Sequence, residues 1–212
     1  MINRLDHIVF GALDLHTGTQ AIELQANTVI PPGGKHPLMG THNSVVSTAA
    51  EEFLEVIAID PQAAPVLRKR WFSLDEPATH ARLKTGARPL CWVVNTTDIE
   101  TLVGQSPVDL GDIIEVTRGD LTWRLTVHAS GQLPLSGVLP VFIEWPGSHP
   151  ARNMQPSGVS VSSINLTHPA PDDINALFAQ LSIDHLATVT AHPEPTIGFD
   201  LITPTGRVVT FD

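Results

Sequence analysis

The sequence predicts an α+β fold in which one βαβββ unit is used repeatedly. The order of strand, helix and further strands occurs three times along the 212 residues. The second and third helices share a spacing, Asp98-Ile99-x-x-Leu102 and Asp173-Ile174-x-x-Leu177. With 42% apolar and 16% charged residues, the chain has the composition of a globular protein with a sizeable core. Such self-similarity is the signature of a repeated supersecondary unit.

The first round occupies residues 1–60. A β-branched and aromatic run at Leu5–Phe10 predicts a strand, and Asp14 can cap a helix over Leu15–Ala26. The cluster Pro31-Pro32-Gly33-Gly34 then breaks the chain, and the apolar runs Thr41–Thr48 and Phe53–Ile59 predict two strands.

The second round occupies residues 89–146. Its first strand is Leu90–Asn95, and Thr97-Asp98-Ile99-Glu100 fits the capping box of a helix start. The runs Gly111–Val116, Leu121–Val127 and Val138–Trp145 predict the three strands that complete it.

The third round occupies residues 158–212, with a strand at Val159–Leu166 and a helix at Asp172–Leu181. Three more strands are expected, at His185–Thr190, Gly198–Thr203 and Arg207–Phe211. Its first strand contains no His and its last no Glu, so this module is expected to hold no ligand. It can serve as structural cover, as a dimerisation surface or as a lid.

Residues 61–88 connect the first two rounds and hold six of the 12 Lys and Arg residues. This segment is either a cationic flap that attracts an anionic substrate group or a solvated helical connector.

Charge and cysteine content limit the function classes. Twelve basic and 22 acidic residues give a net charge of −10, which argues against a nucleic-acid partner. No apolar run approaches the roughly 20 residues of a membrane helix, and the N-terminus has no signal-peptide pattern. A single cysteine, Cys91, fits a reducing compartment. We therefore expect a cytoplasmic protein that acts on a small molecule, with a homodimer left open.

Two residues in apolar strands predict chemistry. His7 shares a strand face with Leu5 and Val9, and Glu55 lies within Phe53–Ile59. A buried carboxylate requires a positive partner, and neither strand contains Lys or Arg. A metal ion can supply that charge, since His and Glu are both common ligands of divalent ions. Alternatively, His7 is a hydrogen-bonded core residue and Glu55 faces solvent.

The second round repeats part of this pattern. Glu144 stands in the apolar run Val141–Trp145, much as Glu55 does in its own strand. Aligning the first strands of the two rounds by Asp14 and Asp98 places Cys91 opposite His7.

Several short motifs, taken in order, resemble a known family. They are Leu5-Asp6-His7-Ile8-Val9, Gly33-Gly34-Lys35-His36-Pro37, Gly40-Thr41-His42-Asn43, Leu54-Glu55-Val56-Ile57-Ala58-Ile59-Asp60 and Phe142-Ile143-Glu144-Trp145 followed by His149-Pro150. Over about residues 5–150 the chain resembles the glyoxalase-like branch of the vicinal oxygen chelate superfamily. The resemblance implies two βαβββ modules that form a cupped, mostly antiparallel sheet, with a divalent metal ion in the cup.

Carried over residue by residue, the resemblance implies His7, Glu55 and Glu144 as metal ligands, with Glu55 and Glu144 also catalytic. The ion would be Zn, Ni, Mn or Fe. The fourth position departs from the family pattern, because Cys91 stands where His or Gln is usual; its side chain is either a thiolate ligand or a small core residue. The implied activity is that of a lyase or isomerase acting on a small substrate with vicinal oxygens.

Substrate contacts are expected at the rim of the cup. His36, His42, Asn43 and His149 are either substrate-binding residues or turn residues. Arg118 and Arg124 either hold a substrate carboxylate or are exposed at strand ends. The alternative function is a metal-free protein of the bleomycin-resistance type that sequesters a small molecule. In that case the four tryptophans, Trp71, Trp92, Trp123 and Trp145, would wall the cup.

Overall fold

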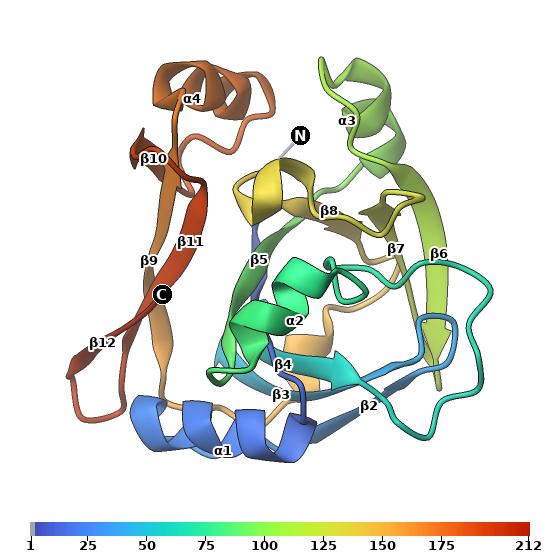
Figure 1. The fold of residues 1–212 in the computed structure, drawn as a ribbon, viewed down its shortest axis with the longest axis vertical. Helices are drawn as coiled ribbons and strands as arrows, with labels where there is room; N and C mark the ends of the chain where they lie inside the picture. Colours follow the sequence, from blue (N-terminus) through green and yellow to red (C-terminus); the bar gives the residue numbers. More distant parts are fainter. Residues whose placement is uncertain (1–2) are drawn as a thin grey trace.

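The computed structural model describes residues 3–212 and contains a curved sheet of eight strands and a second sheet of four (Figure 1). The strand order of the large sheet is β2-β3-β4-β1-β5-β8-β7-β6. The first module comprises β1 (Arg4–Gly11), α1 (Leu15–Ala26), β2 (Pro32–His36), β3 (Thr41–Ala49) and β4 (Glu52–Ile59). No helix among the described residues is long and apolar enough to span a membrane.

The second module repeats the pairing of the first. In each module the first strand pairs in parallel with the last, β1 with β4 and β5 with β8. The antiparallel pair β1–β5 joins the modules into one sheet. These features confirm the predicted α+β cup. The second module comprises β5 (Arg88–Asn95), α3 (Ile99–Gln105), β6 (Asp112–Arg118), β7 (Leu121–Val127) and β8 (Val141–Glu144). The segment before it contains α2 (Pro77–Leu83), and two short 3₁₀ turns lie at Pro134–Gly137 and Pro150–Asn153.

Equivalent caps begin the helices of the two modules. Asp14 Oδ1 accepts a hydrogen bond from the Thr17 amide at 2.8 Å, and Asp98 Oδ1 accepts one from the Thr101 amide at 3.0 Å. Each aspartate thereby satisfies an amide that has no partner within the first turn. The crossover to the next strand thus starts at corresponding places in both modules.

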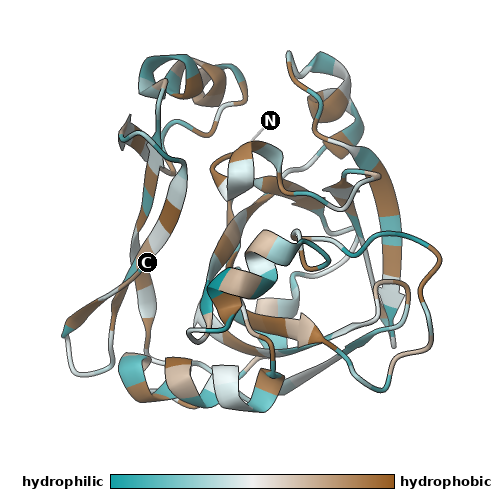
Figure 2. Cartoon of the chain, viewed as in Figure 1, coloured by the Kyte–Doolittle hydropathy of each residue, from teal (hydrophilic) through white to brown (hydrophobic). Residues whose placement is uncertain are grey.

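Both faces of the central strands are buried. Alternate residues of β1 and β5 face two different cores, with Ile8 and Trp92 in one and Val9 and Cys91 in the other. This explains why the strands are nearly continuously apolar in sequence (Figure 2). Residues on the Val9 face line the inside of the cup, and those on the Ile8 face lie on its outside.

The third unit has the expected order of elements but a different pairing. It comprises β9 (Ser160–His168), α4 (Pro171–Gln180), β10 (Thr188–Ala191), β11 (Thr196–Ile202) and β12 (Val208–Phe211). Its first strand pairs with its second and third, giving the order β10-β9-β11-β12, so it is not a third copy of the βαβββ module. Phe199 and Phe211 pack edge-on against Phe10 on the outside of the cup, at 5.4 and 5.0 Å between ring centroids. The third unit is therefore structural cover for the central strands.

Candidate functional site

A bulge at the start of β1 positions the first candidate residue. Leu5 pairs with Val94 and His7 with Val93, so Asp6 is an extra residue on its strand. Bulges re-aim side chains and are common beside active sites. Here the bulge allows Asp6 and His7, although adjacent, to meet: Asp6 Oδ1 lies 2.6 Å from His7 Nδ1.

The carboxylate of Asp6 is fully buried and accepts four hydrogen bonds. Besides His7, its donors are Asn95 Nδ2 at 3.0 Å, Trp145 Nε1 at 2.8 Å and His149 Nε2 at 3.0 Å. Burial raises the pKa of Asp6, but the hydrogen bonds and charges of His149 and His7 outweigh burial and leave the pKa well below its usual range. Asp6 is therefore ionised and joins β1, β5 and the segment after β8.

His7 stands between two carboxylates. Its Nε2 lies 3.6 Å from Glu55 Oε2, which exceeds the length of an ordinary hydrogen bond. Burial lowers the pKa of His7, but the hydrogen bond to Asp6 and the negative charges of Asp6 and Glu55 raise it to about 9. The ring also stacks on Phe53, with 4.2 Å between centroids. At neutral pH the site thus contains an imidazolium whose Nε2–H points toward the cup.

Glu55 is a buried, ionised carboxylate on the floor of the cup. Asn43 Nδ2 donates to its Oε1 at 2.5 Å. Burial raises the pKa of Glu55, but His7, His36 and the Asn43 hydrogen bond together outweigh burial. The net result is a pKa below the usual value for a glutamate. The amide of Asn43 is itself fixed, since its Oδ1 accepts from the Gly34 amide at 2.9 Å. A Cβ atom at Gly33 would lie 2.3 Å from that Oδ1, so the glycine allows β2 to approach Asn43.

Arg118 brings a second positive charge to the cup from the end of β6. Its Nη1 lies 3.1 Å from Asn43 Oδ1 and 3.2 Å from His36 Nε2. Burial lowers the pKa of His36 to about 4, so this imidazole is neutral and its Nε2 accepts the hydrogen bond. The other ring nitrogen, Nδ1, lies 3.0 Å from Thr41 Oγ1. Arg118 also lies over the ring of Trp123, with Cζ 6.0 Å from the centroid.

Aromatic side chains form the walls of the cup and leave a cavity of about 40 Å³. Trp71 and Phe72, from the segment that connects the modules, stack with 5.2 Å between centroids and line this cavity. Trp123 and Trp145 line it from β7 and from the residue after β8. The space holds about one water molecule. The connecting segment therefore fills most of the cup.

Glu144 lies on the opposite face of the sheet from Glu55. In β8, Ile143 pairs with Leu125 and both line the cup, so the neighbouring pair of Glu144 and Arg124 faces outward. Arg124 Nε donates to Glu144 Oε2 at 2.9 Å, and Arg124 Nη1 donates to Glu100 at 2.7 Å. The expected set of His7, Glu55 and Glu144 is therefore not brought together.

The remaining predicted residues are also divided between locations. His36 and Asn43 line the cup, whereas His42 lies on the other face of β3 and borders a groove beside α1. His149 is buried behind Asp6 and has a supporting position. Cys91 is buried on the cup face of β5, and burial raises the pKa of its thiol well above the usual value. Of the four tryptophans, Trp92 alone faces the outer core, where it donates to Val138 O at 3.0 Å.

The donor set in the cup does not fit the expected Zn, Ni, Mn or Fe ion. Such a site needs about three protein donors around one point. Among residues 3–212 no three His, Cys, Asp or Glu side chains are arranged to hold an ion.

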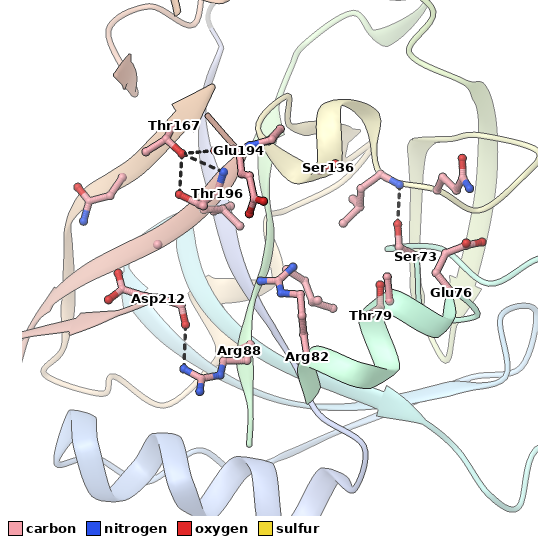
Figure 3. A pocket seen from close by; sticks show the side chains of 18 of the residues that line it. Ser73, Glu76, Thr79, Arg82, Arg88, Ser136, Thr167, Glu194, Thr196 and Asp212 are labelled. Atoms are coloured by element: carbon pink, nitrogen blue, oxygen red, sulfur yellow. Dashed lines mark hydrogen bonds between the residues drawn. The ribbon is translucent and has the colours of Figure 1, made fainter. Parts of the chain in front are cut away.

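A larger cavity, of about 1020 Å³, lies between α2, β5 and the third unit (Figure 3). Arg82 and Arg88 point into it from one side and Glu194 from the other. Its charged side chains are partly or fully exposed, and none forms a buried acid–base pair. The cup is therefore the better candidate for chemistry.

Asp6 is the functional residue that sequence reasoning missed. The available signal was a second polar residue beside His7 in an otherwise apolar strand. Strand alternation would place it on the opposite face from His7, and the bulge that overrides this alternation leaves no mark in the sequence.

A cup built from two βαβββ modules, with a polar cluster on its floor, defines a protein of the vicinal oxygen chelate superfamily. The sequence profile of the glyoxalase-like domain matches residues 5–182, and the chain belongs to this family. No curated protein sequence matches the chain significantly.

Several solved structures are similar to the chain at low sequence identity. A hypothetical protein from Staphylococcus aureus is 14% identical with a TM-score of 0.65, and the match covers 100% of this chain and 99% of that one. A methylmalonyl-CoA epimerase from Streptomyces coelicolor is 15% identical with a TM-score of 0.45, covering 69% of this chain and 96% of its own. A hypothetical protein from Bacillus halodurans is 14% identical with a TM-score of 0.46, covering 70% and 98%. The first of these similarities spans the third unit as well as the cup.

Proposed function

We propose that this protein is a metal-independent enzyme of the lyase or isomerase type that moves a proton on a small substrate, at a carbon next to a carbonyl group. The observation that carries the proposal is the Glu55 carboxylate, which is buried, ionised and directed by Asn43 on the floor of an aromatic cup. A desolvated carboxylate in a fixed orientation is suited to act as a general base.

In the proposed reaction, Glu55 Oε2 takes the proton from the carbon. The C–H bond breaks, and its electron pair forms a carbon–carbon double bond while the carbonyl becomes an enolate. Glu55 then returns the proton to another position of the substrate, which gives isomerisation. Alternatively, the electron pair of the enolate expels a leaving group from the neighbouring carbon, and the proton on Glu55 passes to that leaving group, which gives elimination. Both outcomes leave Glu55 able to start a new cycle.

The enolate oxygen needs positive charge, and His7 is placed to supply it. Its Nε2 atom lies 3.6 Å from Glu55 Oε2, too far for an ordinary hydrogen bond. A substrate oxygen can therefore accept a hydrogen bond from Nε2–H without displacing an existing one. Asp6 fixes the ring through Nδ1 and keeps it protonated. Asp6 is thus a positioning residue. His7 and Arg118 together provide the cationic environment that a metal ion would otherwise provide, and the proposal requires no metal.

The aromatic walls favour a second candidate function. Trp71, Trp123 and Trp145 can surround a small flat molecule without any proton transfer, as in a sequestering protein. Turnover distinguishes the two functions, because sequestration leaves the α-hydrogens of the bound compound in place.

Hydrogen exchange tests the proposal. Small ketones and 2-oxo acids, among them 2-oxobutanoate, are incubated with the protein in D₂O, and loss of α-protons is followed by NMR. We expect Glu55→Gln to slow protein-dependent exchange by about two to four powers of ten. The matched control Glu144→Gln, a carboxylate on the outer face, should exchange at the wild-type rate. Treatment with a chelator or addition of Zn²⁺ should also leave the rate unchanged.

Exchange that survives Glu55→Gln would contradict the role of Glu55. Exchange that requires added metal would contradict the metal-independent reaction. Binding without exchange throughout the panel would support the sequestering protein instead.

A further inference from the structure

We propose that the cup selects substrates that carry a carboxylate, and that the guanidinium of Arg118 binds this group. The inference rests on the proposed function and deepens it by naming the substrate class: small 2-oxo acids or related carboxylates, as opposed to neutral ketones or aldehydes.

The first support is the pairing of Arg118. Its two hydrogen-bond partners, Asn43 Oδ1 and His36 Nε2, are neutral groups. No Asp or Glu of residues 3–212 lies within ion-pair distance of Arg118, although its side chain is partly buried. Arg124, on the same sheet, pairs directly with both Glu144 and Glu100. A partly desolvated guanidinium whose hydrogen-bond partners are neutral is a favourable binding group for an anion.

The second support is the edge of the guanidinium that remains available. Both protein contacts use Nη1, so Nε and Nη2 make no hydrogen bond within the described chain. These two atoms form the side-on edge of the fork, which matches the two oxygens of a carboxylate. Gly34 leaves room for the side chain, because a Cβ there would lie 2.9 Å from Arg118 Cδ.

The third support is the proximity of Arg118 to the base. Asn43 bridges the two groups, accepting from Arg118 at 3.1 Å and donating to Glu55 at 2.5 Å. A carboxylate on Arg118 therefore places the rest of a short substrate near Glu55 and His7. The positive charge of His7 offsets the repulsion between the bound anion and Glu55.

Benzoate and benzamide test the proposal without depending on turnover, because they have nearly the same shape and no α-hydrogen. Binding is followed through the fluorescence of Trp71, Trp123 and Trp145, which line the cup. We expect wild type to bind benzoate at least about 10-fold more tightly than benzamide, as for a charge-assisted hydrogen bond. Arg118→Gln should remove this preference while leaving benzamide binding unchanged, and Arg118→Lys should restore only part of it. The control Arg124→Gln should behave as wild type.

Equal affinities for the two probes in wild type, or a preference that survives Arg118→Gln in a folded variant, would overturn the inference. Deuterium exchange separates this failure from failure of the proposed function. If 2-oxobutanoate and its methyl ester exchange at equal rates, the reaction stands and the carboxylate selection is wrong. If benzoate is preferred through Arg118 but no compound exchanges, the selection stands and the reaction is wrong.

Discussion

The two modules of the cup have the same topology but opposite interiors. On the inner face of the first module lie His7, Glu55 and Asn43, whereas the corresponding face of the second consists largely of apolar residues such as Ile143 and Leu125. The second module contributes one polar group to the cup, Arg118, from the end of a strand. Duplication of a fold thus does not require duplication of its polar residues: most of the polar cluster lies in one module, and the other forms a largely apolar wall.

The largest stability effect is expected at Asp6, on the polar side of this comparison. Asp6→Asn removes the charge that its four hydrogen-bond donors share and directs an amide NH₂ group toward them. We expect the free energy of unfolding to fall by about 3–5 kcal/mol, the usual loss when one partner of a buried pair is removed. Urea denaturation measures it.

The control for Asp6→Asn is Glu144→Gln, which changes the outward-facing carboxylate of the second module. Glu144→Gln affects a pair near the surface, and such pairs contribute about 1 kcal/mol or less. Equal losses for the two variants would mean that the Asp6 cluster is no more important to stability than a surface ion pair.

Stability should also depend on pH through His7. Its pKa is about 9 in the folded protein and about 6.5 when unfolded, so its contribution is fully present below pH 6.5 and is lost as the pH rises through 9. A difference of this size corresponds to about 3 kcal/mol. Denaturant titrations at pH 6, 7.5 and 9.5 measure the loss, and His7→Gln should remove it. An identical decline in that variant would assign the pH dependence to another group.

The smallest effect is expected at Cys91, on the apolar side. Because the thiol is buried and its pKa is raised, Cys91→Ala should cost about 1 kcal/mol and leave proton exchange unchanged. Thermal melts and the exchange assay measure both effects. Rapid reaction of the native protein with a thiol reagent, or loss of exchange in the variant, would show that the second module contributes chemistry after all.

The residue pattern predicted the repeated strands and helices, and the resemblance to a known family predicted the cup; within the polar cluster, His7 and Glu55 were predicted and Asp6 was not. Periodic apolar runs and two Asp caps indicated the strands and helices, and His7 and Glu55 stood out because their neighbours are apolar. The face of Glu144 could not be predicted. Both faces of β8 are buried, so its sequence has no alternation to distinguish inside from outside, and a shift of one residue exchanges them.

The position of Arg118 was equally hidden. In sequence it is a strand-end residue beside a Gly-Asp turn, and only the curvature of the sheet brings it to His36 and Asn43, 82 and 75 residues away. Trp71 was expected in the cup only for a sequestering protein, and Phe72 was not expected there at all, since both positions depend on contacts between a connecting segment and distant strands.

The insertion of Trp71 and Phe72 into the cup also affects how fast a ligand can associate. Phe72 and Ser73 adopt left-handed backbone conformations, with φ of 58° and 56°, which side-chain-bearing residues rarely occupy. The turn is held by Ser73, whose amide donates to Gly131 O at 2.9 Å and whose Oγ accepts from the Leu133 amide at 2.8 Å. Because Trp71 and Phe72 leave only about 40 Å³ of the cup free, we expect a larger molecule to enter after this turn releases, and the observed association rate should then level off at high ligand concentration. Its plateau would then be the opening rate of the turn, the same for every ligand.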